Sequence, residues 1–180
     1  TITKANPANF SFTIPALTQN DLKIVYQLLI DYDATNSEVT LKTADIYVES
    51  DTDVWKIEKC VFERGLFQIS KDRVVSVAVS GTGAKLSRYG AKGVALPGTL
   101  QVRSGTTTFI EPYYISTLIG GQETPNITSI SIEISNEVQW IPATTLHKSL
   151  GVTDASNTVY SDAFVVSKRV LSGTIQQYVT

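Results

Sequence analysis

The amino-acid sequence predicts a mainly β domain: two packed antiparallel sheets, as in a β-sandwich or barrel, flanked by one α-helix. Three observations lead to this expectation. Short segments of alternating apolar and polar residues recur along the chain, turn residues separate them, and only one segment strongly suggests a helix. The chain has 180 residues, the length of one ordinary domain, and no internal repeat or linker divides it. We therefore treat residues 1–180 as a single domain.

The first elements expected are an arm, a strand and the helix. Residues 1–9 are polar and indicate an N-terminal arm, and residues 10–14 alternate as a strand does. Asn20 has the character of a helix cap and Asp21 suits the first turn, so a helix is predicted over 20–31. The apolar residues of this segment also alternate, which leaves a strand as the alternative. The cap and the unbranched Lys, Gln and Leu residues favour the helix.

The middle of the chain is predicted to be a series of short strands followed by a loop. The strands expected here cover residues 44–50, 54–63, 66–70 and 73–80, with turns at 51–53, 64–65 and 71–72. Residues 81–98 contain five glycines, together with Lys85, Arg88 and Lys92. A segment of this composition indicates a long loop, and such loops inside a domain are usually functional.

The last third of the chain is expected to return to strands. The predicted strands are 99–103, 106–110, 127–135, 139–142, 158–166 and 169–179. Residues 112–119 fit either a strand or a short helix, and the sequence leaves both open. The clearest alternation lies in 127–135, where three isoleucines point one way and small polar residues point the other. We expect Ile130, Ile132 and Ile134 to face the core and Ser129, Ser131, Glu133 and Ser135 to face water or another polar surface.

The charge pattern argues against nucleic-acid binding and suggests contacts between copies. The net charge is −2, whereas a protein that grips phosphates carries a basic surplus. Charged residues make up 18% of the chain, below the usual value of about 25%. Residues 21–63 hold ten acids against four lysines, and residues 64–103 hold seven bases against one acid. Such blocks can make a surface complementary to itself, or they can intermix once the chain folds.

Catalytic and cofactor chemistry find no support in the sequence. The chain has one histidine, His147, and one cysteine, Cys60, which is too few for a thiolate metal site or a disulfide. No nucleophile elbow is present, and residues 81–85 lack the spacing of a phosphate-binding loop. We expect no enzyme activity and no cofactor, with Cys60 as a small buried hydrophobe. No apolar run reaches the roughly 18 residues of a membrane span.

Several of these segments together resemble the tail tube proteins of bacteriophages, the major tail proteins of phages with long, non-contractile tails. In the middle of the chain the resemblance rests on three strand segments, and in the last third on an alternating strand that ends in Asn and a later strand that contains Arg and Ser-Gly. These are residues 44–49 (ADIYVE), 54–61 (VWKIEKCV), 74–83 (VVSVAVSGTG), 129–138 (SISIEISNEV) and 167–175 (SKRVLSGTI). They span most of the chain from about residue 40 onward.

This resemblance implies a structural virion protein that assembles with itself. Hexameric rings would stack into a hollow tube around a tape-measure protein, joined by tail-end proteins, and DNA would pass through the tube without specific binding. The protein would be made in the cytoplasm of the bacterial host and reside in the virion. The alternatives are a tube protein of a contractile tail or of a type VI secretion system, and a virion adaptor or carbohydrate-binding β-sandwich.

The resemblance also assigns expected roles to the candidate residues. In a ring of identical copies, the face that carries Ser129, Ser131, Glu133 and Ser135 would line the channel, where Glu133 would repel phosphates. The alternative is an outer sheet face that is merely solvated. The loop at 81–98 would lie between subunits, with Lys85, Arg88 and Lys92 as contact residues.

Overall fold

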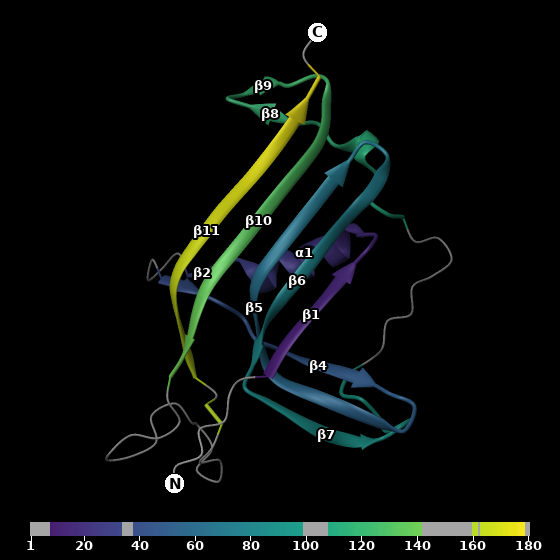
Figure 1. Ribbon diagram of the computed structural model, residues 1–180, viewed down its shortest axis with the longest axis vertical. Coiled ribbons are helices and arrows are strands. Elements are labelled where there is room, and N and C mark those ends of the chain that lie inside the picture. Colours follow the sequence, from purple (N-terminus) through teal and green to yellow (C-terminus); the bar gives the residue numbers. More distant parts are fainter. Residues whose placement is uncertain (1–7, 34–37, 99–107, 142–159, 162, 179–180) are drawn as a thin grey trace.

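A computed structural model describes residues 8–33, 38–98, 108–141, 160–161 and 163–178. This part of the chain is mainly β with one α-helix, and it forms a large antiparallel sheet and a second one that shares a strand with it, which confirms the predicted fold class (Figure 1). The strands are β1 (Ala8–Ile14), β2 (Asp31–Asp33), β3 (Glu38–Thr40), β4 (Ala44–Glu49), β5 (Asp53–Ser70), β6 (Arg73–Gly83), β7 (Lys85–Ala91), β8 (Leu118–Ile119), β9 (Gln122–Glu123), β10 (Ile127–Trp140) and β11 (Phe164–Gln177). The helices are α1 (Gln19–Leu29) and the short 3-10 turn η1 (Pro112–Tyr114).

The strand β5 belongs to both sheets. In the large sheet the strand order is β1-β6-β5-β10-β11, and every neighbouring pair is antiparallel. The first half of β5, residues 53–60, pairs instead with β4 and β7. We call this second, three-stranded unit the projecting sheet, because it extends from one end of the molecule (Figure 1). Two further hairpins, β2–β3 and β8–β9, form small sheets of their own.

The helix forms where it was predicted, but a different residue caps it. The hydroxyl of Thr18 accepts a hydrogen bond from the Asp21 backbone N–H at 3.1 Å, and the Asp21 carboxylate accepts one from the Thr18 N–H at 3.0 Å. This reciprocal capping box satisfies two backbone donors at once and fixes the start of α1. Asn20 therefore lies inside the helix, and the prediction that it caps the helix is wrong.

The turn predicted at residues 64–65 does not exist, because β5 runs unbroken for 18 residues. Gly65 suggested a turn, yet it meets a different need. A Cβ atom at this position would lie 2.2 Å from Cδ1 of Leu29 on α1. The glycine thus lets the helix lie directly on the strand, and its neighbour Arg64 continues the strand on the opposite face.

The loop predicted at 81–98 is also wrong over much of its length, since residues 85–91 form strand β7. Gly81 and Gly83 extend β6 instead of ending it, and they let neighbouring strands approach closely. A Cβ atom on Gly81 would lie 1.9 Å from the carbonyl oxygen of Val61 on β5. Farther on, residues 112–119 are neither wholly strand nor wholly helix, because η1 and β8 divide them.

Near the C-terminus the predicted strands merge into longer ones. Residues 139–140 continue β10, and β11 joins the segments expected at 158–166 and 169–179, with a register shift opposite Glu137 that accommodates the irregularity between them. Residues 108–110 are not in a strand. The arm predicted over 1–9 is wrong for residues 8–9, which begin strand β1, and its residues 1–7 lie outside the described residues, as does the strand expected at 99–103.

The hydrophobic core lies between α1 and one face of the large sheet. Leu17, Val25 and Leu29 contribute from the helix side, and they pack against the buried side chains of Val77 and Ile134, among others. Full burial of one such side chain is worth roughly 1.5–3 kcal/mol. The core continues into the projecting sheet through residues of β4 and β5, so one core serves both sheets.

Candidate functional site

The face of the large sheet that points away from α1 is built mainly of small polar side chains. Directly opposed residues of antiparallel strands share a face, so the register identifies its members. Ser80, for example, lies opposite both Ser11 and Arg64, and Gln68 lies opposite Ser131. We call this surface the polar face. It comprises Ser11 and Thr13 of β1, Arg73, Ser76, Ala78 and Ser80 of β6, Arg64, Leu66, Gln68 and Ser70 of β5, Ser129, Ser131, Glu133, Ser135 and Glu137 of β10, and Lys168, Val170, Ser172, Thr174 and Gln176 of β11.

The four residues predicted from β10 all lie on the polar face, but the isoleucine face behind them is only partly buried. Ile134 is 2% exposed beneath α1, whereas Ile132 is 37% exposed. The difference arises because α1 packs mainly on β5, and its cover ends before the upper part of β10. Alternation thus identified the two faces correctly and overestimated how much of the apolar one is covered.

Two charged members of the polar face, Arg64 and Glu133, bind each other. The Arg64 guanidinium donates from Nε to Oε1 of Glu133 at 2.8 Å and from Nη2 to Oε2 at 2.9 Å. This two-pronged geometry matches the planar guanidinium fork to a carboxylate. The hydrogen bonds from Arg64 hold the pKa of Glu133 below its ordinary value. The sequence analysis missed the pair, because it placed Arg64 in a turn.

The outer edges of the large sheet are open in the described part of the chain. Strand β11 pairs with β10 along one side, and no other described strand pairs with its second side; the same holds for β1 beyond β6. The open edge of β11 is 14 residues long and carries exposed apolar side chains, among them Leu171 and Ile175. Free edges of this kind offer unpaired backbone donors and acceptors to another strand.

A buried polar anchor ties β11 to the end of the helix. Asn136 is 4% exposed and donates to the carbonyl oxygen of Leu29 at 3.0 Å. Arg169 donates from Nε to Oδ1 of Asn136 at 2.7 Å, and its guanidinium also reaches the carbonyl oxygens of Asp31 and Thr40 at 3.4–3.5 Å. Burial lowers the pKa of Arg169. These bonds fix the position of β11 and hence of one open edge.

The basic residues predicted as subunit contacts lie on and beside β7, away from the polar face. Arg88 donates to Oδ1 of Asp53 at 2.6 Å, and this bond lowers the pKa of Asp53. The ammonium of Lys85 lies 5.3 Å from the ring centre of Tyr160. Lys92 donates its backbone N–H to a neighbouring turn at 2.8 Å. The structure therefore spreads Lys85, Arg88 and Lys92 along the projecting sheet, with Lys85 at the start of β7 and Lys92 just after its end.

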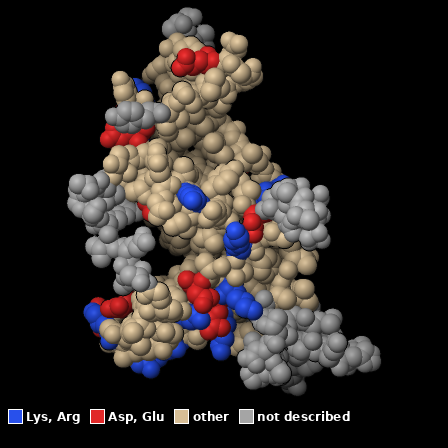
Figure 2. All heavy atoms as spheres, turned by 180° about the vertical axis from the view of Figure 1, so that it is seen from behind, with Lys and Arg blue, Asp and Glu red and all other residues tan. Residues whose placement is uncertain are grey.

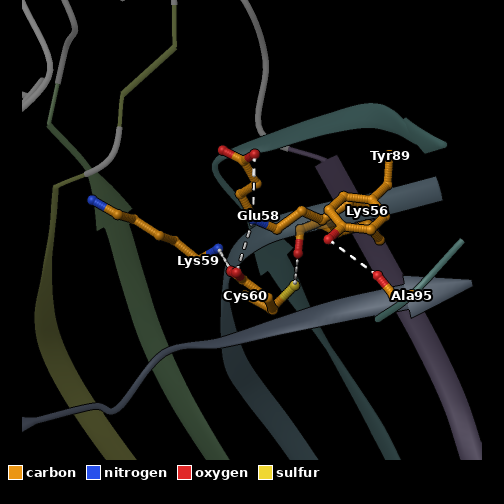
Figure 3. A network of polar contacts seen from close by, with 8 residues as sticks. Lys56, Glu58, Lys59, Cys60, Tyr89 and Ala95 are labelled. Atoms are coloured by element: carbon orange, nitrogen blue, oxygen red, sulfur yellow. Dashed lines mark hydrogen bonds and ion pairs between the residues drawn. The ribbon is translucent and has the colours of Figure 1, made fainter. Parts of the chain in front are cut away.

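Charged side chains gather at the base of the projecting sheet, where β5 changes partners (Figure 3). Lys56 forms ion pairs with Asp45 at 3.0 Å and with Glu58 at 3.5 Å. Lys59 has a left-handed backbone, with φ 49°, and its N–H donates to the Asp45 carboxylate at 2.9 Å. This local bulge marks the point at which β5 passes from β4 and β7 to β6 and β10.

Cys60 is a buried small hydrophobe, as expected from the sequence. Its side chain is fully buried, and its thiol donates to the carbonyl oxygen of Ile57 at 3.3 Å. Burial raises the pKa of the thiol to about 11, which keeps it protonated at neutral pH. Within the described residues no group of three or more His, Cys, Asp or Glu side chains could hold a metal ion. The described part of the chain also has no helix long and apolar enough to cross a membrane.

No known family model matches the chain, and a comparison with curated proteins finds no match either. The functional interpretation therefore rests on the residues and their arrangement.

Proposed function

We propose that the chain is a structural virion protein, the major tube subunit of a long phage tail. Copies would assemble into stacked hexameric rings that form the channel for DNA, with a tape-measure protein and tail-end proteins as partners. One observation carries the proposal: among the described strands, the large sheet has two unpaired edges and one face made mainly of small, uncharged side chains. The resemblance of the strand segments to tail tube proteins supports the same conclusion.

The open edges suit assembly by addition of identical copies. Strands β1 and β11 occupy opposite edges of a sheet of five antiparallel strands, so they run in the same direction. A neighbour rotated about an axis along the strands can therefore place its β1 edge beside the β11 edge of the first copy. Repetition of one such head-to-tail contact closes a ring when the rotation divides a full turn. Closure leaves no free edge, as in any barrel.

Exposed apolar side chains beside the β11 edge support a covered surface there. Ile132, Leu171 and Ile175 share the face that carries α1, and they are 37–68% exposed. Contiguous apolar surface of this kind marks an interaction site in most proteins. A neighbouring copy seated at the edge would cover it.

The polar face suits the wall of a channel for DNA. Serine, threonine and glutamine present hydroxyl and amide groups, which exchange hydrogen bonds with water and carry no charge to hold phosphates. A basic wall would gain affinity by releasing counterions from DNA and would slow its passage. We propose that Ser129, Ser131, Glu133 and Ser135 line the channel as part of this face.

The projecting sheet suits contacts between successive rings. Val48, Trp55 and Leu86 lie side by side on one of its faces and are 41–53% exposed. Arg88 lies next to Trp55 in the register. An aromatic residue flanked by aliphatic side chains and an arginine is typical of the centre of a protein interface. Lys85, Arg88 and Lys92 keep their proposed role as subunit contacts, here as residues of a strand and its turn.

Electron microscopy of a matched pair of variants tests the proposal. The wild-type protein at high concentration should form hollow tubes or rings in negative stain. Leu171→Lys places a charge at the open edge of β11 and should give a folded protein without tubes. The control Ile24→Lys adds the same charge at an exposed apolar position on α1, which is 47% exposed, and should retain tubes. Monodisperse wild-type particles under all conditions would contradict the proposal and favour a virion adaptor.

A further inference from the structure

The central strand of the polar face contains one arginine, which is a strong phosphate ligand, and Glu133 occupies it as its partner. Arg64 lies on the central strand β5, with its side chain 56% exposed. An exposed guanidinium on such a face would bind a phosphate through two parallel N–H···O bonds. Glu133, diagonally across from Arg64 on β10, already accepts those two bonds at 2.8 and 2.9 Å. Hydroxyl, amide and aliphatic groups make up most other members of the polar face, and Arg73, Glu137 and Lys168 are its remaining charged members.

We infer that Glu133 masks Arg64, so that a polymer of phosphodiesters can move past this arginine without being held by it. The inference rests on the proposed function, because it requires DNA to meet this face. It also revises the expectation that Glu133 acts alone as a repelling charge. The pair has no net charge, so each copy contributes a dipole to the wall instead of a negative charge.

A phosphate diester is the alternative acceptor for Arg64, and Glu133 competes with it. A carboxylate and a phosphate diester present similar pairs of oxygens to a guanidinium, so they compete for the same two donors. The carboxylate is tethered to the neighbouring strand, which gives it a high effective concentration at Arg64. A passing phosphate must displace it and leave a carboxylate unpaired beside the DNA. Both effects oppose binding at this position.

A set of single and double variants isolates the mask. Glu133→Gln removes the charge with little change in shape and frees Arg64. The double variant Glu133→Gln with Arg64→Gln removes both charges and restores a neutral pair. Asp53→Asn is a matched control, because it frees Arg88 from a pair of the same type on the projecting sheet, with the same change in net charge.

Binding of a short fluorescein-labelled DNA duplex is measured by anisotropy, for assembled and for unassembled protein, over a series of salt concentrations. Circular dichroism and negative-stain images verify the fold and the assembly of each variant. At low salt Glu133→Gln should bind the duplex about tenfold more tightly than the double variant, as one charged contact provides. Its salt dependence should steepen by about 0.9 for each phosphate contacted. The wild type should match the double variant.

Equal binding by Glu133→Gln and the double variant would overturn the inference, and so would an equal gain in Asp53→Asn, because the gain would then not depend on the position of Arg64 on the polar face. Images of the wild type decide the proposed function separately. If tubes form and Glu133→Gln gains no affinity, the mask is refuted and the tube proposal stands. If tubes never form, the tube proposal fails, and the unassembled protein still reports whether Glu133 covers Arg64.

Discussion

The two halves of β5 support surfaces of opposite character. Residues 53–60 belong to the projecting sheet, where charges are dense and paired in local networks such as Lys56 with Asp45. Residues 64–70 belong to the large sheet, where small polar side chains predominate on the exposed face and charged residues, such as the Arg64–Glu133 pair, are sparse. Figure 2, seen from behind, shows the same contrast on the other side, with acidic and basic residues concentrated at the end occupied by the projecting sheet.

The contrast teaches how one strand can serve two tasks. A densely charged surface with an apolar centre discriminates between partners, because wrong pairings leave charges unmatched. A surface of small, uncharged polar groups makes no strong or selective contact with a molecule that passes over it. In the proposed tube the first suits contact between subunits and the second suits the passage of DNA. The predictions below change one half of the molecule at a time.

The largest loss of stability is expected from a substitution in the anchor formed by Asn136 and Arg169. Asn136→Leu removes the acceptor of Arg169, leaves that half-buried guanidinium without its shortest hydrogen bond, and deprives the Leu29 carbonyl of its side-chain donor. Loss of a hydrogen bond to a charged group costs about 1.5–3 kcal/mol. The free energy of unfolding, measured by urea denaturation, should fall by about this amount. Ser135→Ala, the adjacent position on the polar face, should change it by less than about 0.5 kcal/mol. Equal stability of the two variants would refute the role of the anchor.

A smaller loss is expected where α1 lies on β5. Gly65→Ala forces a methyl group into Leu29, and overpacking of this kind costs about 1–3 kcal/mol. Gly90→Ala on β7 is the control, because the added methyl group meets only the side chain of Val94 at 3.0–3.1 Å. Thermal unfolding should show a clear loss for Gly65→Ala and a lesser one for Gly90→Ala. The reverse order would mean that the helix does not lie against the strand as described.

A substitution on the projecting sheet should prevent the formation of long tubes without destabilising the folded protein. Leu86 is 53% exposed, so Leu86→Lys should alter the free energy of unfolding by less than about 0.5 kcal/mol. In the proposed tube it places an unpaired charge in the contact between rings, so sedimentation should show rings or monomers in place of long tubes. Leu86→Met preserves the apolar side chain and should retain tubes. Long tubes from Leu86→Lys would exclude this face from the contact.

The ion pair between Arg64 and Glu133 should stabilise the folded protein slightly, by an amount that depends on pH. Its hydrogen bonds with Arg64 lower the pKa of Glu133 in the folded state, so the stabilisation is present above the ordinary glutamate pKa of about 4.3. It is lost as the pH falls through the lowered pKa. The urea midpoint of the wild type should exceed that of Glu133→Gln at pH 7, and the two should converge in acid. A constant difference across this range would contradict the linkage.

No reaction is expected at Cys60 while the protein is folded. Its thiol is buried and its pKa is raised to about 11, so little thiolate exists at pH 8 and reagents cannot reach it. A disulfide reagent should label the folded protein no faster than it unfolds, and should label the urea-unfolded protein at once. Rapid labelling of the folded protein would show that the junction between the two sheets opens.

Local patterns in the sequence sufficed for the fold class and for the polar face. Alternation depends only on neighbours two residues apart, so it placed Ser129, Ser131, Glu133 and Ser135 on one face without knowledge of the register. Gly65 misled the prediction because a glycine in a turn and a glycine beneath a helix look alike in sequence. The difference depends on Leu29, which approaches only when the chain folds.

Contacts between strands that are distant in the sequence could not be predicted, for the same reason. Arg64 and Glu133 are separated by 69 positions, and only the register of β5 and β10 brings them together. Gly81 and Gly83 suggested a loop, because their close approach to β5 is a property of strand pairing. At the helix, a hydroxyl at Thr18 and an amide at Asn20 are both good caps, and the side chain of Asp21 decides between them by closing the capping box.

The unbroken length of β5 has a mechanical consequence. Eighteen residues at about 3.3 Å each give a strand of roughly 60 Å that runs through both sheets. A force applied along β5 does not break its hydrogen bonds one after another. The bonds to β4, β7, β6 and β10 lie across the direction of the pull, so they share the load and yield together. Tension applied at the projecting sheet is therefore transmitted along the backbone of β5 into the large sheet.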